Sequence, residues 1–490
     1  MTDKIDNTQF DRLQTGVPGL DEILCGGLLP QAVYIVQGGP GEGKTILANQ
    51  FCYYRAKLGE RALYVTLLAE THNRLLRHLR KMDFMADTGD QQSVFYGSAF
   101  DTLRQDGLEG VLRFLMRNAK SHDVSTIVVD GLFALEESAE TERSFREFIN
   151  DLAAFADISG STVLLLTNSE RSTGSPEFTM VDGWIELNSG ELECRSFRYI
   201  RVHKLRGSGF VAGRHMTRIN QQGFHVYPRL ESVAGDARAV AMREERVSSG
   251  VPSLDELIEG GFPYSSSTAL VGPTGIGKTS LGLAFICQST VEEPGLLFGF
   301  YEDSIRLERR AAALGLDLAS LLESGAVEIL NYPPTEQIVD HLAEDMLHAV
   351  RRRGVKRLFV DGVDGFRQAA VYPLRTGRFL SALISCLRAD GVTTVFTAEL
   401  PELMGGENAM QFTAISAVAE NILLLRYAEL DATLHRTLAV MKMRESSFAP
   451  YVFEFHIGQD GFQIDSRMSG TEGVISGLPH RQGRGENTDG

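Results

Sequence analysis

The chain has 490 residues, of which 43% are hydrophobic and 23% charged, with 48 Lys and Arg against 64 Asp and Glu. This composition is typical of a folded chain with room for two or more domains, and it excludes disordered and fibrous proteins. The net charge of −16 argues against an extended nucleic-acid surface, because phosphate backbones are bound chiefly by clustered Lys and Arg.

The five cysteines are scattered and odd in number, and none belongs to a Cys-x-x-Cys pair. We therefore expect neither a disulfide framework nor a zinc site, and the reducing cytoplasm is the expected location. The chain opens on polar and charged residues, and no run approaches about 18 consecutive apolar residues. The sequence thus predicts neither an export signal nor a membrane anchor.

The chain contains two copies of one long pattern. Residues 12–24 read Arg-Leu-Gln-Thr-Gly-Val-Pro-Gly-Leu-Asp-Glu-Ile-Leu and match residues 246–258 at an offset of 234 positions. The glycine-rich segment at residues 38–45 matches residues 272–279 at the same offset. Later landmarks keep nearly this spacing, namely Asp130 with Asp361 and Lys204-Leu-Arg206 with Lys442-Met-Arg444. Landmarks that recur in one order predict two tandem homologous domains.

We expect the first domain over residues 1–230, a linker over 231–245, the second domain over 246–466 and a flexible tail over 467–490. The linker has small and charged residues in place of strand-like sequence, as domain boundaries commonly do. The tail loses the apolar periodicity that precedes it, which is typical of a flexible terminus.

Within each copy, short apolar runs rich in β-branched residues alternate with amphipathic stretches, such as residues 145–155. The buried strands expected from these runs lie at residues 32–36, 62–66, 126–129 and 162–166 of the first copy and at 296–300, 357–360 and 393–396 of the second. The alternation predicts an α/β fold in which a mostly parallel central sheet carries helices on both faces. Strand-rich sequence ends each copy and predicts an antiparallel extension of the sheet.

Both glycine-rich segments satisfy Gly-x-x-x-x-Gly-Lys-Thr, and each lies between a predicted strand and a predicted helix. In this motif the glycines turn backbone N–H groups around an anion, the lysine reaches the β- and γ-phosphates, and the threonine hydroxyl ligates Mg²⁺. A single match can be a glycine turn that binds nothing, but two matches in register favour a nucleotide. The expected nucleotide-binding residues are Gly39, Gly41, Gly43, Lys44, Thr45, Gly272, Thr274, Gly275, Gly277, Lys278 and Thr279.

Asp130 and Asp361 each follow an apolar strand run, so we expect them at a strand's carboxyl end beside the phosphate loop. A carboxylate there can hold the hydration shell of Mg²⁺ together with Thr45 or Thr279. Taken singly, an Asp that ends a strand is as often a turn residue, and the shared register favours the metal role.

Hydrolysis also needs a group that orients or polarises the attacking water. In the second copy, Glu302 and Asp303 stand together at the end of a strand, and Glu302 is also a candidate metal ligand. The first copy reads Thr66-Leu-Leu-Ala-Glu70 there, with one apparent extra residue, so Glu70 is its only nearby candidate base. The alternative for each carboxylate is a solvated acid that opens a helix, where the helix dipole favours it.

Lys204 and Arg206 end an apolar strand as Lys-x-Arg, and so do Lys442 and Arg444. A single such pair usually marks a solvated strand edge that discourages further pairing. Because the pair recurs at the same place, we expect these residues to stabilise the charge that develops in a neighbouring subunit's site. The active sites would then lie between subunits.

Residues 12–466 resemble the KaiC family, double-domain ATPases of the RecA superfamily associated with circadian clocks. The resemblance is carried by Thr15-Gly-Val-Pro-Gly-Leu-Asp, Ser249-Gly-Val-Pro-Ser-Leu-Asp, the first phosphate loop, His203-Lys-Leu-Arg-Gly-Ser and Met441-Lys-Met-Arg. It implies two tandem RecA-like P-loop domains that bind ATP and Mg²⁺. It also implies a homo-hexamer of two stacked rings with nucleotide at every subunit interface, ATPase activity in the first ring and autokinase activity in the second.

Three departures from the family bear on this expectation. Where clock proteins carry adjacent Ser and Thr phosphoacceptors, the chain has Ser416 and Ala417, so we expect no two-site cycle and transfer to Ser416 alone, with Glu302 as base. An ordinary buried helical serine is the alternative reading. Ala69 replaces one of two expected glutamates, which argues against strong hydrolysis in the first ring. The short tail lacks an obvious partner-binding helix, so the usual clock partners are not assumed.

Two other functions stay open at this point. A RecA-like DNA-dependent ATPase shares the core, but the net charge of −16 and the short basic run at residues 351–353 disfavour it. The other is an interaction scaffold in which nucleotide stabilises assembly by mass action and turnover is incidental, an idea that the missing carboxylate of the first copy motivates.

Overall fold

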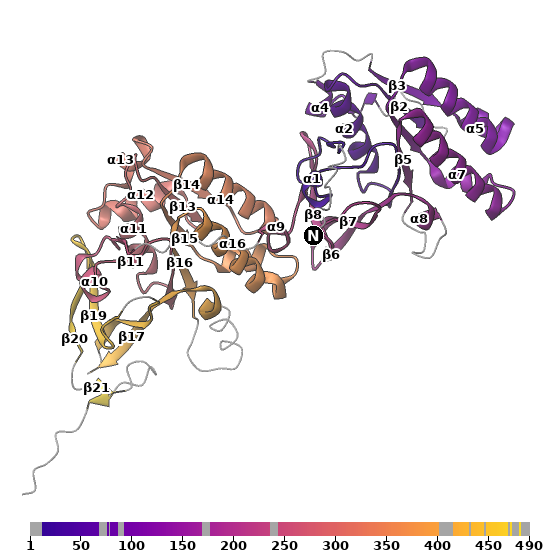
Figure 1. Ribbon diagram of the computed structural model, residues 1–490. Helices are drawn as coiled ribbons and strands as arrows, with labels where there is room; N and C mark the ends of the chain where they lie inside the picture. Colours follow the sequence, from indigo (N-terminus) through magenta and orange to yellow (C-terminus); the bar gives the residue numbers. More distant parts are fainter. Residues whose placement is uncertain are drawn as a thin grey trace, which may run out of the picture. The chain divides into compact units, whose positions relative to one another are not determined.

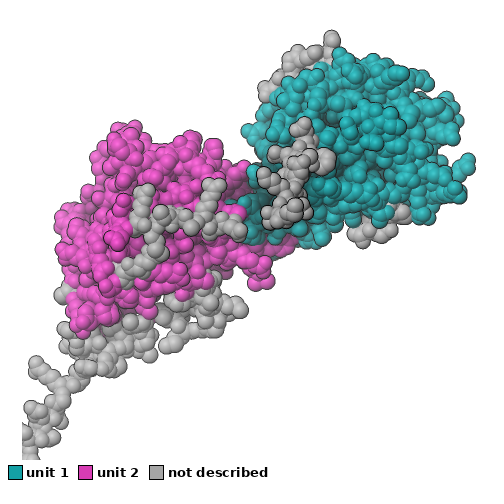
Figure 2. Space-filling view, in the orientation of Figure 1, with its two compact units in different colours: residues 1–233 teal, residues 234–490 magenta. Residues whose placement is uncertain are grey.

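The computed structural model describes residues 12–67, 76–77, 79–86, 93–168, 177–235, 244–400, 415–430, 433–444, 447–468, 471–472 and 480–481. The chain divides into two compact units, Met1–Val233 and Ala234–Gly490 (Figure 2). In the described residues, each unit is built around one nine-stranded sheet.

The first unit, coloured from indigo to magenta in Figure 1, has its strands in the order β3-β2-β4-β5-β1-β6-β7-β8-β9. They are β1 (Val33–Gly38), β2 (Ala62–Thr66), β3 (Val94–Ser98), β4 (Thr126–Asp130), β5 (Thr162–Thr167), β6 (Gly183–Leu192), β7 (Arg195–Leu205), β8 (His215–Asn220) and β9 (Gly223–Tyr227). Pairing is parallel from β3 to β6 and antiparallel from β6 to β9. The central strands are buried on both faces, which explains their continuous apolar sequence.

Helices cover both faces of this sheet. On β1, Tyr34 and Val36 pack into the core that includes α2, whereas Val33 and Ile35 pack into the core that includes α5 and α7. Successive side chains of a strand point to opposite faces, so two separate cores form. The described helices are α1 (Leu20–Ile23), α2 (Lys44–Lys57), α4 (Asp83–Ala86), α5 (Phe100–His122), α6 (Leu132–Glu137), α7 (Glu142–Ser159), α8 (Glu177–Met180) and α9 (Leu230–Val233).

The second unit repeats this architecture with the strand order β14-β13-β15-β16-β12-β17-β18-β19-β20. Its sheet contains β12 (Ser267–Gly272), β13 (Gly295–Gly299), β14 (Val327–Asn331), β15 (Arg357–Asp361), β16 (Thr393–Glu399), β17 (Asn421–Leu430), β18 (Thr433–Lys442), β19 (Val452–Gly458) and β20 (Gly461–Arg467). The described helices are α10 (Pro252–Leu257), α11 (Lys278–Ile286), α12 (Ser304–Ala313), α13 (Leu318–Glu323), α14 (Val339–Arg353), α15 (Asp364–Ala369), the 3₁₀ turn η1 (Pro373–Arg375) and α16 (Thr376–Ala389).

The strand pairing confirms the predicted α/β fold with a mostly parallel sheet and an antiparallel extension in both copies. Each phosphate loop follows β1 or β12, the fifth of the nine strands in its sheet, and leads directly into α2 or α11. In parallel α/β sheets this carboxyl edge is where ligands bind. The fold therefore places the two motifs where the sequence predicts them.

The ends of the units lie near the expected linker and tail. The division between units falls after Val233, where α9 also ends, and a short strand β10 (Arg246–Val247) pairs with β11 (Phe262–Pro263) at the start of the second copy. Beyond β20, the two-residue strands β21 (Thr471–Glu472) and β22 (His480–Arg481) pair with each other. The exact domain limits and the flexible tail stay predictions.

Candidate functional site

The glycines of each phosphate loop adopt backbone angles that other residues rarely reach. Gly43 and Gly277, which precede α2 and α11, have φ of 98° and 121°. In the first loop, a Cβ atom on Gly43 would lie 2.6 Å from Cδ1 of Ile219, whereas nothing lies within 4 Å of the Cβ position of Gly41. The loop is thus closely packed at its helix end and open at its middle, where a ligand would approach.

The motif lysines fold back over their own loops. The Lys44 ammonium donates to the carbonyls of Gly38 and Gly39 at 2.5 and 2.9 Å, and that of Lys278 donates to Gly272 and Pro273 at 2.7 and 2.8 Å. Burial lowers the pKa of both lysines, and nearby carboxylates oppose that shift. Each ammonium therefore lies inside the cradle that the loop forms.

The predicted metal-binding pairs come together in both copies. The Thr45 hydroxyl lies 3.4 Å from Oδ2 of Asp130, and the Thr279 hydroxyl lies 3.0 and 3.3 Å from the two carboxylate oxygens of Asp361. Both aspartates end their strands, β4 and β15, beside the loop. Hydroxyl and carboxylate oxygens are hard donors of the kind that Mg²⁺ prefers, so these residues fit that ion.

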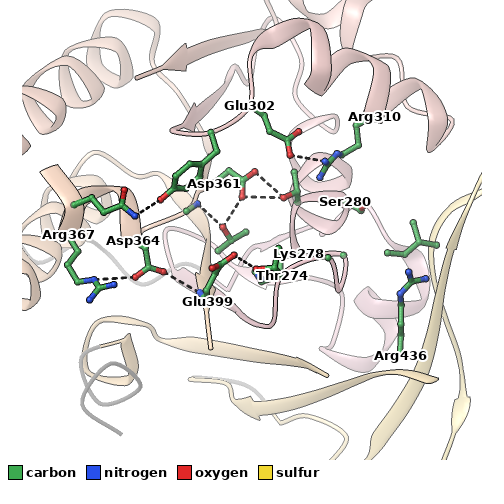
Figure 3. A pocket seen from close by; sticks show the side chains of 18 residues that line it. Thr274, Lys278, Ser280, Glu302, Arg310, Asp361, Asp364, Arg367, Glu399 and Arg436 are labelled. Atoms are coloured by element: carbon green, nitrogen blue, oxygen red, sulfur yellow. Dashed lines mark hydrogen bonds and ion pairs between the residues drawn. The ribbon is translucent and has the colours of Figure 1, made fainter. Parts of the chain in front are cut away.

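In the second copy these groups line a cavity of about 840 Å³, shown in Figure 3. Four acidic and four basic side chains line it, which suits a ligand that carries both phosphate and a cation. Charged residues among the lining are Lys278, Glu302, Arg310, Asp361, Asp364, Arg367, Glu399 and Arg436.

Sequence reasoning found three of these charged residues and missed the other five. Glu399 ends β16, the strand next to the phosphate-loop strand, and accepts a hydrogen bond from the Thr274 hydroxyl at 2.8 Å. A strand-end acid was visible in the sequence, but its place beside the loop depends on the strand order. Asp364 and Arg367 are carried by α15, and Arg310 by α12.

Of the adjacent acids Glu302 and Asp303, Glu302 is the one that lines the cavity, and it forms an ion pair of 2.7 Å with Arg310. Burial raises its pKa above the ordinary Glu value, and the Arg310 cation opposes that rise. Asp303 has a different place: its side chain accepts from the Arg306 amide at 2.9 Å and caps α12. Of the two adjacent carboxylates, the geometry therefore favours Glu302 as the base.

Glu70 lies outside the described residues, but the strand register corrects one expectation about it. Thr66 pairs with Asp130 in the first copy, and Gly299 pairs with Asp361 in the second. Counting from these positions along the sequence, Ala69 corresponds to Glu302 and Glu70 to Asp303. The extra residue expected in the first copy is not needed, and the missing carboxylate is the one at the Glu302 position.

The Lys-x-Arg pairs do not line the cavity of the second copy. The Lys204 ammonium donates to the carbonyls of Phe178, Thr179 and Val181 at 3.2, 2.7 and 2.7 Å, and the Lys442 ammonium donates to those of Ser416 and Ala419 at 2.9 and 2.7 Å. Cations satisfy carbonyls at a helix C-terminus in this way. Each lysine thus caps a short helix of its own copy.

The arginines of these pairs are more exposed. Arg206 donates to the Thr179 carbonyl at 2.8 Å and lies 3.7 Å from Asp182, while Arg444 is exposed. Ser416 is half-buried in the helical residues 415–418 and does not line the cavity of its own copy. A role for Lys442, Arg444 or Ser416 in nucleotide chemistry would therefore involve a site other than the cavity of their own copy.

Comparison with known proteins agrees with this geometry. The KaiC ATPase family model matches residues 13–231 and again residues 247–469, so it includes both phosphate loops. The chain belongs to the KaiC family. Its two units are tandem RecA-like ATPase domains, a fold and activity class that the resemblance in the sequence predicts.

Several curated KaiC proteins match almost the whole chain. The circadian clock oscillator protein KaiC of Prochlorococcus marinus is 27% identical, with 96% of each chain covered. That of Parathermosynechococcus lividus is 28% identical over 96% of this chain and 88% of its own. The circadian clock protein KaiC3 of Synechocystis is 26% identical over 96% of this chain and 95% of its own. Among the described residues, no helix has the length and apolar character needed to cross a membrane.

Proposed function

We propose that this KaiC-family protein binds and hydrolyses ATP with Mg²⁺, with one site in each copy, and that it works as a homo-hexamer of two stacked rings. The observation that carries the proposal is a phosphate-loop threonine hydroxyl beside a strand-end aspartate, present in both copies. Phosphoryl transfer depends mainly on positioning and charge stabilisation, and these are the groups that supply both.

The residues of each loop bind and orient the triphosphate. Backbone N–H groups of the glycine turn face the phosphates. Lys44 and Lys278 can exchange their loop carbonyls for β- and γ-phosphate oxygens without leaving the cradle. The threonine and aspartate of each copy would hold the ion, and bound Mg²⁺ supplies positive charge that neutralises the phosphoryl oxygens.

Glu302 is the proposed general base of the second copy. Its place on the cavity wall puts a carboxylate within the space that the attacking oxygen must enter. Burial raises its pKa, which strengthens its basicity, while Arg310 keeps it in the charged form that can accept a proton. The proton acceptor for water and for a serine hydroxyl would be the same group.

The two copies are proposed to differ in turnover. Ala69 stands where Glu302 stands in the second copy, so the first copy lacks this carboxylate and depends on Glu70. We therefore assign faster hydrolysis to the second copy and mainly nucleotide binding to the first. Nucleotide that binds only the assembled state stabilises the assembly, which gives the first copy a function even at slow turnover.

The Lys-x-Arg pairs support the proposed hexamer. Lys442 and Arg444 do not line their own copy's cavity, so a role in nucleotide chemistry would be in the site of an adjacent subunit, as a closed ring provides. Lys204 and Arg206 are proposed to act likewise in the first ring. To reach a neighbour, each lysine has to release the helix carbonyls that it holds here.

Ser416 is the proposed phosphoacceptor. Its neighbour Ala417 has no hydroxyl, so transfer involves one residue in this segment. The serine is half-buried, and it belongs to the short helix that Lys442 holds. Release of that lysine toward a γ-phosphate would free the same helix that presents the acceptor.

Incubation of the purified protein with γ-labelled ATP tests the enzymatic part. We expect phosphate release that Lys278→Ala reduces strongly, that Lys44→Ala reduces less, and that the double variant abolishes. Release unaffected by the double variant would remove the ATPase proposal. Added DNA should leave the rate unchanged; stimulation with a steep salt dependence would instead favour the DNA-dependent ATPase.

The same samples test phosphotransfer and assembly. Label retained on the chain should map to Ser416 and disappear in Ser416→Ala; a stable label elsewhere, or none, would remove the kinase part alone. Light scattering with and without ATP should show a hexamer that nucleotide stabilises. A monomer insensitive to nucleotide would count against both the hexamer and the scaffold function.

A further inference from the structure

Each strand-end aspartate lies between two neighbouring strands of its sheet. Asp130 on β4 has β2 on one side and β5 on the other, and Asp361 on β15 has β13 and β16. Because both sheets have the same strand order, every residue beside Asp130 has a counterpart beside Asp361. The comparison shows which groups hold each carboxylate.

In the first copy the carboxylate is held from β2. The Tyr64 hydroxyl donates to Oδ2 of Asp130 at 2.6 Å, the same oxygen that lies 3.4 Å from the Thr45 hydroxyl. The Tyr64 side chain is fully buried in the core that includes α2. On the opposite side, Leu166 of β5 pairs with Asp130 and offers no hydrogen bond from its side chain.

In the second copy the carboxylate is held from the other side. The Thr397 hydroxyl on β16 donates to Oδ1 of Asp361 at 2.8 Å. The same hydroxyl accepts the Gly362 amide at 2.7 Å, which directs its proton toward the aspartate. Thr279 is nearer to the other oxygen, Oδ2, at 3.0 Å.

The strand register shows that the hydroxyl donors occupy opposite positions in the two copies. Thr66 and Gly299 both pair with the strand-end aspartate, so Tyr64 corresponds to Leu297. Leu166 pairs with Val36, and Thr397 pairs with Leu270 at the matching position of the phosphate-loop strand, so these two residues correspond. At these two positions each copy thus has one hydroxyl and one leucine, on opposite sides of its aspartate.

We propose that Tyr64 in the first copy and Thr397 in the second are positioning residues that orient the metal-binding aspartate. The proposal rests on the Mg²⁺-ATP sites proposed above. A carboxylate that accepts a hydrogen bond from a hydroxyl is oriented by it, as metal ligands commonly are by the groups that support them. To orient the aspartate, one hydroxyl donor is needed on either side of it, and each copy has one such donor. Core packing alone does not require a hydroxyl at either position.

The test measures nucleotide binding against Mg²⁺ concentration in the full chain. Lys278→Ala silences the second site, and a non-hydrolysable fluorescent ATP analogue then reports the first. In Tyr64→Phe we expect the Mg²⁺ concentration for half-maximal binding to rise about tenfold, a typical cost of losing such a support. Binding of the analogue without Mg²⁺ should stay unchanged, which shows that the domain is folded.

Rescue and control variants separate positioning from packing. Leu166→Thr added to Tyr64→Phe installs the second copy's arrangement, and it should restore most of the Mg²⁺ response. Tyr34→Phe is the matched control, because Tyr34 is equally buried on β1 and its hydroxyl bonds Leu29 instead. Thr397→Val in a Lys44→Ala chain should give the same tenfold loss at the second site.

The outcomes distinguish this inference from the proposed function. If binding in the Lys278→Ala parent does not respond to Mg²⁺, both the metal site and the positioning role are overturned. Suppose instead that binding in the parent responds to Mg²⁺. If Tyr64→Phe then has the same Mg²⁺ dependence, or loses as much affinity without Mg²⁺ as with it, only the positioning role is overturned. A tenfold shift that Leu166→Thr reverses supports it.

Discussion

Glu302 and Arg310 form an ion pair of 2.7 Å on the wall of the second copy's cavity. The pair joins the strand-end segment after β13 to the last turn of α12, so it holds the carboxylate against the sheet edge where the phosphate loop opens (Figure 3). In the first copy Ala69 takes the place of Glu302, so the side chain at that position carries no carboxylate.

Removal of the Glu302 carboxylate should stop chemistry and spare binding. Glu302→Gln keeps the shape of the side chain but cannot accept a proton, and a general base contributes about 10² to 10⁴ in rate. We expect ATP turnover of the second site, measured in a Lys44→Ala background, to fall by about 10² or more, while nucleotide affinity stays within a few fold.

Asp303→Asn is the control for this substitution. It changes the adjacent carboxylate, whose observed contact is the cap on α12. Asn is itself a good N-cap, so we expect turnover and stability to stay near those of the parent. Equal losses in turnover for both variants would count against Glu302 as the specific base.

The Arg310 cation should set the pH at which the second site loses activity. The base works in its deprotonated form, so turnover falls as pH falls through the pKa of Glu302. Burial already raises that pKa and Arg310 opposes the rise, so Arg310→Ala should raise the pKa further. We expect the acidic limb of the pH–rate profile to move to higher pH.

Arg309→Ala is the matched control for the pH experiment. Arg309 is exposed on the same helix and is not among the residues that line the cavity. Its profile should follow that of the parent. An Arg310→Ala profile displaced to lower pH, or not displaced, would contradict the assignment of Glu302 as the titrating group.

Among substitutions far from the cavity, those that break a buried ion pair of the second unit should lower the free energy of unfolding most. Arg375 donates to both carboxylate oxygens of Asp340, whose side chain is 1% exposed. Arg375→Ala removes this cation from a buried carboxylate, and the expected loss in unfolding free energy is about 3–5 kcal/mol. Denaturant unfolding measures this loss.

The double variant tests whether the loss in unfolding free energy arises because the buried Asp340 carboxylate loses the Arg375 cation. Asp340→Leu with Arg375→Leu removes both charges and fills similar volume, so it should be less destabilising than Arg375→Ala alone. If the double variant loses as much as the sum of the single variants, each side chain stabilises the unit through its packing instead.

The parts of the site that follow from local sequence were predictable. The phosphate loops are contiguous motifs, and the meeting of Thr279 with Asp361, 82 positions apart, follows because parallel strands end at one edge of the sheet. Because the two copies match in register, the same reasoning predicts that Thr45 lies beside Asp130. The alternation of strands and helices was enough for the fold class.

The parts that depend on tertiary placement were not predictable. Tyr64 reads as an ordinary core residue of a strand, and only the pairing with β4 puts its hydroxyl on Asp130. Glu399 reads as a strand-end acid until the strand order places it beside the loop. The Lys-x-Arg pairs were expected to act in a neighbouring subunit's site, and the sequence did not indicate that Lys442 holds carbonyls of its own copy. Periodicity carries no information about such neighbours.

Mixed subunits should decide whether Lys442 acts on an adjacent site. A Lys442→Ala subunit keeps a complete phosphate loop, and a Lys278→Ala subunit keeps a complete Lys-x-Arg pair. Each variant alone should be nearly inactive at the second site. In mixed assemblies of the proposed hexamer, some interfaces would join the intact loop of one subunit to the intact pair of the other, so turnover should exceed the sum of the separate rates. The rates are measured in a Lys44→Ala background to silence the first ring. If the mixture gives only the weighted mean of its parts, Lys442 acts within its own chain as the cap of residues 415–419 that it forms here.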